Sequence, residues 1–190
     1  MAENREKGLK IKFTTTRAAL IVAMASIAVA LLFYQYLVPK PITSVAYGNY
    51  ILNFELDLRE ADKVPVYPSE EAINRELMHG LVQTVTIAFK PVDSAGNSLY
   101  SKESMQIIFN LRPGYLVRDL NPSFNAVNVT SYEYLPGKIQ NPIIALVHPA
   151  YANETSVSVD GHVVTIKGRT SEELILATEK FLMAALGIEV

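Results

Sequence analysis

The side chains best suited to acid–base or metal chemistry are three histidines that stand far apart in the sequence. They are His79, His148 and His162, and no two of them could share a helical turn. The chain contains no cysteine, so it lacks the thiolate ligands of a typical closed zinc site. We therefore expect no metal site and no cofactor.

Local catalytic motifs are also missing from the sequence. It has no glycine-rich phosphate loop, no G-x-G-x-x-G after a predicted strand and no G-x-S-x-G nucleophile turn. Acidic residues gather at Asp57, Glu60 and Asp62, which run from the solvated face of a predicted strand into a loop. A glycosidase pair or a calcium loop needs more convergence than this. We interpret the cluster as a solvated acidic face.

A second kind of candidate is the aromatic content of the proline-rich stretch 112–142. Its rings are Tyr115, Phe124, Tyr132 and Tyr134. Tyrosine and phenylalanine bury a large area at low entropy cost and dominate contact surfaces when exposed. Prolines reduce the conformational freedom that such a loop would lose on binding. We predict a partner-facing surface here, and the alternative is that the rings pin the loop to the core of the domain.

Two sequons give candidate glycosylation sites. They are Asn128-Val129-Thr130 and Asn153-Glu154-Thr155, whereas proline excludes Asn121-Pro122-Ser123. The predicted sites are therefore Asn128 and Asn153. Because Asn128 lies inside the aromatic stretch, a glycan there would restrict which part of it a partner can cover.

The element that places all these residues is a charge-free apolar run, residues 18–38. At about 1.5 Å per residue, some twenty helical residues cross a hydrocarbon core of about 30 Å. The tail before the run, residues 1–17, has five basic and two acidic residues, and positive flanks stay cytoplasmic. We predict a single-pass signal anchor in the lipid bilayer of the cell membrane. Its N-terminus is cytoplasmic and its C-terminal domain is extracytoplasmic.

Two other interpretations of this run stay open. The first is a cleaved secretory signal, because Ala28–Ala30 offers small residues at cleavage spacing. That cut would leave an apolar N-terminus at Leu31. The second is a pilin-like leader cut after Gly8, although the polar residues 9–17 then separate the cut from the apolar helix.

A stripe of small residues follows one side of the predicted membrane helix. Small residues let two helices approach closely in lipid. The stripe predicts contact with a second membrane helix, unless alanine is simply filler here. Its members are Ala19, Ala23, Ser26 and Ala30.

The exported part is mildly acidic. From Lys40 to the end the chain carries 12 basic and 17 acidic residues, which argues against nucleic acid as a partner. We divide this part into a linker, residues 39–48, and one domain, residues 49–190, which is long enough for a single core.

Hydrophobic patterns predict the strands of this domain. Residues 49–59, 82–90 and 103–111 alternate between apolar and polar positions, as half-buried strands do. Residues 143–147 are all apolar, as in a central strand. Residues 157–167 form a predicted hairpin around an Asp160-Gly161 turn.

Two helices complete the predicted fold. Ser69 begins one over residues 70–80, and a capping box of Thr170 and Glu173 begins the other over residues 171–186, which Gly187 ends. The broad apolar face of the second helix should pack across a sheet. The fold class is α+β, with a mixed or antiparallel sheet of about six strands and two helices on one face.

These features favour a non-catalytic binding or accessory module of the cell envelope. Its expected partners are envelope proteins or polymers. One alternative is an anchored enzyme acting on envelope polymers, using Asp119, Glu133 or His148. Another is a small subunit of a larger membrane complex.

Overall fold

The computed structural model describes residues 43–190. No helix in this range is long and apolar enough to cross a membrane. The predicted tail, membrane span and small-residue stripe lie outside the described residues. The description begins with an antiparallel hairpin of β1 (Thr43–Tyr47) and β2 (Tyr50–Phe54). Since β1 lies inside the predicted linker 39–48, the folded domain begins before residue 49.

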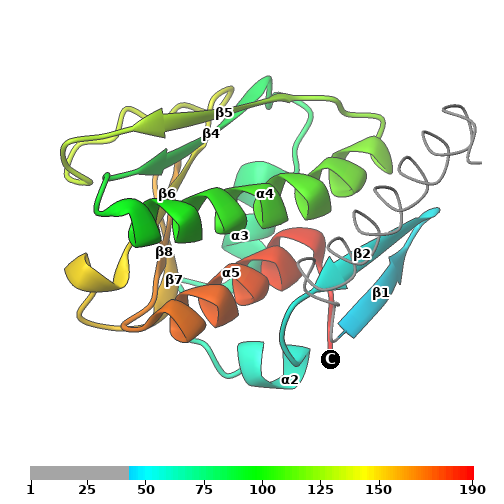
Figure 1. Ribbon diagram of the computed structural model, residues 1–190. Coiled ribbons are helices and arrows are strands. Elements are labelled where there is room, and N and C mark those ends of the chain that lie inside the picture. Colours follow the sequence, from blue (N-terminus) through cyan, green and yellow to red (C-terminus); the bar gives the residue numbers. More distant parts are fainter. Residues whose placement is uncertain (1–42) are drawn as a thin grey trace, which may run out of the picture. The chain divides into compact units, whose positions relative to one another are not determined.

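A six-stranded mixed sheet forms the centre of the domain (Figure 1). Its spatial order is β3-β7-β8-β6-β4-β5, with β7 and β8 antiparallel and every other neighbouring pair parallel. The strands are β3 (Val66–Tyr67), β4 (Thr84–Phe89), β5 (Ser123–Asn128), β6 (Ile143–Val147), β7 (Ser156–Asp160) and β8 (Val163–Lys167). The sheet is thus mixed, one of the two predicted types, and the predicted number of about six strands is confirmed.

The predicted central strand and the predicted hairpin both form. All five residues of β6 are buried, and this strand lies between β8 and β4. The β7–β8 hairpin also forms, but Asp160 pairs with Val163, so the turn is Gly161–His162, one residue later than predicted. Gly161 has φ +54, a value that glycine adopts without a steric penalty.

Both predicted helices form where their capping residues stand. The side chain of Ser69 accepts a hydrogen bond from Ala72 N (3.3 Å) before α3 (Glu70–Leu77). Thr170 Oγ1 accepts from Glu173 N (3.1 Å) before α5 (Ser171–Leu186). Two short elements accompany them, α2 (Leu58–Ala61) and the 3-10 helix η1 (Pro149–Tyr151).

The predicted strand 103–111 is wrong, because it lies inside a long helix, α4 (Ser94–Leu116). Asp93 begins this helix by accepting a hydrogen bond from Gly96 N (2.8 Å). Met105 and Phe109, which the alternation placed inward, are 49% and 64% exposed. The inward face instead follows helical spacing, and its apolar members include Tyr100, Ile107, Leu111 and Tyr115. Helices α3, α4 and α5 therefore pack against the sheet, one more than predicted.

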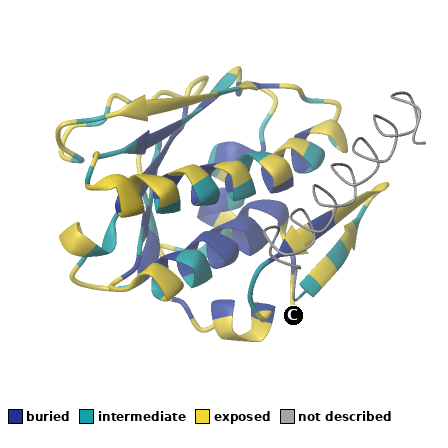
Figure 2. Ribbon diagram, viewed as in Figure 1, coloured by how far each residue is buried: buried dark blue, intermediate teal, exposed yellow. Residues whose placement is uncertain are grey.

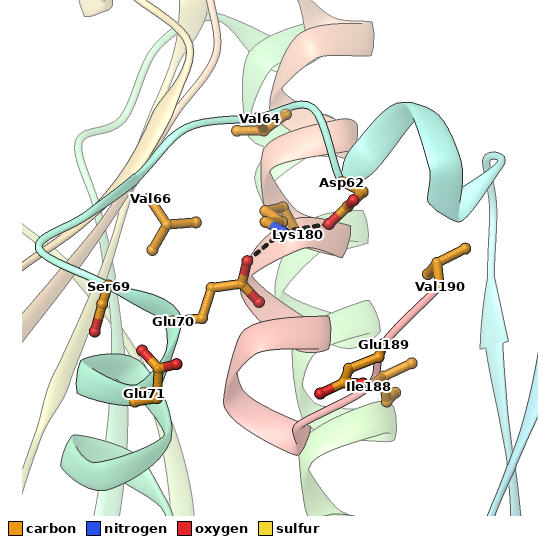
Figure 3. A pocket seen from close by; sticks show the side chains of 10 residues that line it. All are labelled: Asp62, Val64, Val66, Ser69, Glu70, Glu71, Lys180, Ile188, Glu189 and Val190. Atoms are coloured by element: carbon orange, nitrogen blue, oxygen red, sulfur yellow. Dashed lines mark hydrogen bonds and ion pairs between the residues drawn. The ribbon is translucent and has the colours of Figure 1, made fainter.

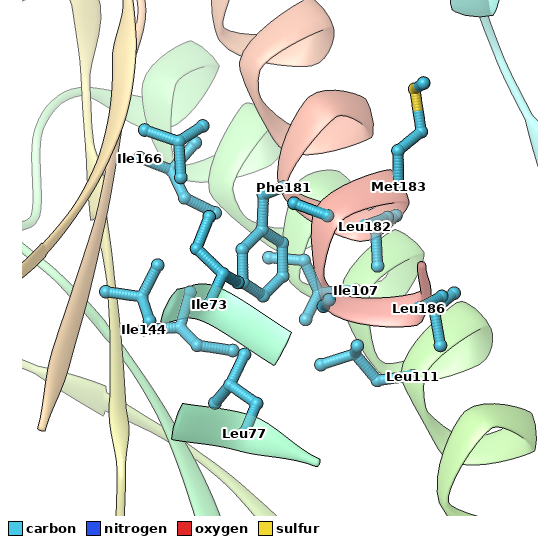
Figure 4. Close-up of a cluster of buried hydrophobic side chains, with 14 of the residues drawn as sticks. Ile73, Leu77, Ile107, Leu111, Ile144, Ile166, Phe181, Leu182, Met183 and Leu186 are labelled. Atoms are coloured by element: carbon cyan, nitrogen blue, oxygen red, sulfur yellow. The ribbon is translucent and has the colours of Figure 1, made fainter. Parts of the chain in front are cut away.

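The core lies between the sheet and these three helices. Phe181 of α5 lies among side chains of the sheet, α3 and α4 (Figure 4). Burial falls off toward β5, which is exposed along most of its length (Figure 2). The core side chains drawn around Phe181 include Ile73, Leu77, Ile107, Leu111, Ile144 and Ile166.

Candidate functional site

Two of the predicted surface aromatics belong to the core. Tyr115 is fully buried, and its hydroxyl donates to Leu77 O (2.8 Å). Phe124 packs edge-on against Tyr115, with ring centroids 6.0 Å apart, and is partly buried. The predicted partner-facing role is therefore wrong for Tyr115, and Phe124 mainly pins β5 to α4.

Tyr132 pins its segment to the sheet, which agrees with the alternative interpretation of the aromatic stretch. Its hydroxyl donates to Leu146 O (2.6 Å) and accepts from Lys90 N (2.8 Å). Tyr100 lies within hydrogen-bond distance of the same hydroxyl (3.1 Å), and His148 N donates to the Tyr100 hydroxyl (3.1 Å). Since the single proton of Tyr132 goes to the carbonyl of Leu146, Tyr100 must be the donor between the two tyrosines.

Burial keeps both tyrosines protonated. It raises the pKa of Tyr100 far above its ordinary value, and it also raises the pKa of Tyr132. The chain of hydrogen bonds is therefore complete throughout the physiological pH range. It joins Lys90, just after β4, to Leu146 in β6, and so fixes the start of segment 132–137 at the carboxyl ends of these parallel strands.

Tyr134 is the predicted aromatic that reaches solvent. It is 98% exposed and has φ +100, an uncommon backbone conformation for a bulky residue. Close packing holds the end of the same segment, because a Cβ on Gly137 would lie 2.4 Å from His162 O. The segment is thus fixed at both ends, and the Tyr134 ring projects from between them.

A groove of about 540 Å³ lies between segment 132–137 and the β7–β8 hairpin. Val163 and Thr165 line it, and they alternate with the core residues of β8, so the groove lies on the sheet face opposite the helices. The remaining lining residues come from the segment and the turn: Tyr132, Glu133, Tyr134, Leu135, Gly137, Asp160, Gly161 and His162.

The groove is acidic and aromatic. Glu133 and Asp160 supply two carboxylates, and no lysine or arginine lines this groove in the described part of the chain. His162 Nδ1 lies 2.7 Å from Glu76 Oε1, so a further carboxylate orients the histidine from α3. This arrangement can hold a cationic group by charge and by the face of an aromatic ring.

The residues of the enzyme alternative do not converge. Asp119 precedes β5 at the amino ends of the parallel strands, whereas His148 follows β6 at their carboxyl ends. A five-residue strand separates these two edges by about 16 Å. Glu133 lies in the groove. No group of three or more metal-binding side chains occurs within residues 43–190.

A second depression, of about 550 Å³, surrounds a buried lysine (Figure 3). Lys180 Nζ lies 2.6 Å from both Asp62 Oδ1 and Glu70 Oε1, and its side chain is 3% exposed. Burial opposes the charged amine, but the two carboxylates outweigh burial and raise the pKa of Lys180. A protonated amine cannot act as a nucleophile, so we interpret this cluster as a clamp that ties α5 to α2 and α3.

A carboxyl group with a raised pKa lies between α4 and α5, outside both depressions. Glu103 is fully buried, and neither of its carboxyl oxygens has a hydrogen-bond partner among the described residues. Burial raises the pKa of Glu103 to about 7. The nearby Thr178 hydroxyl and Lys102 lower this pKa, but by less than burial raises it. Glu179 faces it from α5; burial raises the pKa of Glu179 too, although Glu55 N and Leu56 N donate to it.

Both predicted glycosylation sites are exposed. Asn128 ends β5, and Asn153 lies between η1 and β7.

No protein-family model, no curated protein and no solved structure matches this chain.

Proposed function

We propose that this chain is a membrane-anchored, extracytoplasmic and non-catalytic binding module of the cell envelope, and that its groove receives a partner protein. The observation that carries the proposal is Tyr134, whose ring is almost wholly exposed beside the groove. Exposed tyrosines at the edge of a depression are typical anchors of protein contacts.

The backbone of Tyr134 supports this interpretation. A bulky residue at positive φ costs on the order of 1–3 kcal/mol, and such conformations cluster at functional sites. No packing within the domain compensates for this conformational cost, because the Tyr134 ring is 98% exposed. A partner that covers the ring would supply the missing contacts.

The groove favours a basic side chain of that partner. Glu133 and Asp160 offer charge, and the face of Tyr134 offers a cation–π contact. From Lys40 to the end the chain has five more acidic than basic residues, so the wider charge has the same sign. An arginine with one face on the ring and its N–H groups toward the carboxylates fits this chemistry.

The anchor explains why such a site could work at modest affinity. The charge-free run 18–38 would hold the domain at the outer surface of the cell membrane. A partner confined to the same surface meets the groove at raised effective concentration.

The test is purification of the full chain from its membrane in mild detergent, followed by mass spectrometry of the proteins that accompany it. Tyr134→Ser should lose a specific partner, and Tyr50→Ser, which alters an exposed tyrosine in the separate β1–β2 sheet, should retain it. Salt should release the same partner, because the contact is charged. Identical accompanying proteins for all three chains would defeat the proposal.

A further inference from the structure

The edge strand β5 presents an open row of hydrogen-bonding groups. It is the last strand of the sheet, and β4 is its one neighbour among the described strands (Figure 1). Ser123 N donates to Gln83 O and Val129 N donates to Phe89 O, each at 2.9 Å. Since alternate residues of a strand face the same neighbour, the even-numbered residues of β5 point their N–H and C=O groups away from β4.

These outward groups belong to Phe124, Ala126 and Asn128. Within residues 43–190 no strand lies beyond β5, and no backbone hydrogen bond to a loop or turn involves these groups. Ala126 and Asn128 are exposed, and Phe124 is partly buried. The edge therefore offers three donors and three acceptors at regular spacing.

The two edge strands of the sheet differ in length and composition. At the other end, β3 has two residues and lies between Pro65 and Pro68, so it gives an approaching strand little to pair with. By contrast, β5 has six residues and contains neither proline nor a charged side chain. Natural sheets usually protect a long edge with one of these devices. The bare edge of β5 thus indicates a surface that is covered in the working assembly.

We propose that the edge of β5 pairs with β5 of a second copy of this chain, antiparallel about a two-fold axis. In such a contact a strand lies opposite a copy of itself, so a strand with a net charge would repel its equivalent. Residues 120–132 carry no charge at all, which removes this penalty. Two copies anchored in one membrane also meet at raised effective concentration.

The register follows from the outward groups. With Ala126 opposite Ala126 of the second copy, Phe124 lies opposite Asn128, and the outward residues of both strands pair with one another. This register makes about six hydrogen bonds, one for each outward N–H of the two strands. Small side chains then meet on the axis. The helices of both copies lie on the same side of one continuous sheet.

A single cysteine tests the register, because the chain has none of its own. Cysteine in place of Ala126 should form a covalent dimer under a mild thiol oxidant, with full-length protein in its membrane. Residues opposite each other in such a ladder lie about 5.5 Å apart, within disulfide reach. Ser123→Cys is the matched control on the same strand; its two copies would lie about 20 Å apart and should stay monomeric.

Charge tests the contact without a covalent bond. Ala126→Lys and Ala126→Asp should each be monomeric in detergent while keeping the wild-type circular dichroism spectrum, and mixing the two should restore the dimer. Three results would overturn the proposal: equal cross-linking at residues 123 and 126, a mixture that stays monomeric, or a monomeric wild-type chain in the membrane. A monomeric wild-type chain would assign the edge to a strand of a different protein.

Discussion

Replacing Glu103 with glutamine should stabilise the domain above neutral pH. The side chain of Glu103 is fully buried between α4 and α5, and its carboxyl oxygens have no hydrogen-bond partner among the described residues. Burial raises its pKa from 4.5 to about 7, so ionising it in the folded chain is costly. Glutamine has nearly the same shape and never ionises.

The size of the effect follows from the shift in pKa. One pKa unit corresponds to about 1.4 kcal/mol, so a rise from 4.5 to about 7 represents roughly 3 kcal/mol. Below pH 4.5 both the folded and the unfolded chain hold the proton. Between pH 4.5 and 7 the unfolded chain releases it first, so the free energy of unfolding falls as pH rises through this window. Burial raises the pKa of the neighbouring Glu179 as well, which adds to the same slope.

The assay is urea unfolding of the full chain in mild detergent at pH 5 and pH 8, followed by far-ultraviolet circular dichroism. The wild-type chain should be less stable at pH 8. Glu103→Gln should flatten this dependence and gain about 1–3 kcal/mol at pH 8, the lower figure allowing for an unpaired amide. Glu60→Gln, an exposed glutamate on α2, is the control and should change little. Equal wild-type stability at both pH values would show that ionising Glu103 in the folded chain carries no cost.

Four further substitutions test the groove and the lysine clamp. Tyr132→Phe should lower the free energy of unfolding by about 1–3 kcal/mol, because two backbone groups lose their partner, whereas Tyr134→Ser should change it by less than about 0.5 kcal/mol. Gly137→Ala should cost about 1–3 kcal/mol, because the new methyl group would lie against His162 O; an unchanged melting temperature would contradict this. Lys180→Met should cost about 2 kcal/mol at pH 7, because Asp62 and Glu70 lose their cationic partner; an unchanged midpoint of urea unfolding would disprove this.

Local signals were enough to predict much of the sheet and two of the helices. The all-apolar run of β6 indicates burial on both faces, and the capping residues Ser69 and Thr170 stand where α3 and α5 begin. Such signals involve residues close in sequence, so they can be recognised in one amino-acid sequence. The hairpin turn near Gly161 belongs to the same class.

The failure at α4 has a physical reason. Residues 105, 107, 109 and 111 alternate by coincidence within a helix, and Gly96, Pro113 and Gly114 further disguise it. The stronger signal was the spacing of seven and four between Tyr100, Ile107 and Leu111, preceded by a capping aspartate.

The site depended on contacts between distant segments. The hydroxyl of Tyr132 meets groups 42 and 14 residues away in the sequence, and no local pattern encodes those hydrogen bonds. The same holds for Glu103, whose neighbour Glu179 lies on another helix. Sequence reasoning did identify the aromatic stretch as important, but it could not tell the buried Tyr115 from the exposed Tyr134.

The most direct test of an anchored, extracytoplasmic binding domain is single-cysteine labelling of intact cells with a membrane-impermeant maleimide. The chain has no cysteine of its own, so one replaces Tyr134 in the groove and another replaces Glu3 in the tail. We expect rapid labelling at position 134 in intact cells, and labelling at position 3 only after lysis. Labelling at position 134 only after lysis, or at position 3 in intact cells, would contradict an anchored binding domain that presents this groove outside the membrane.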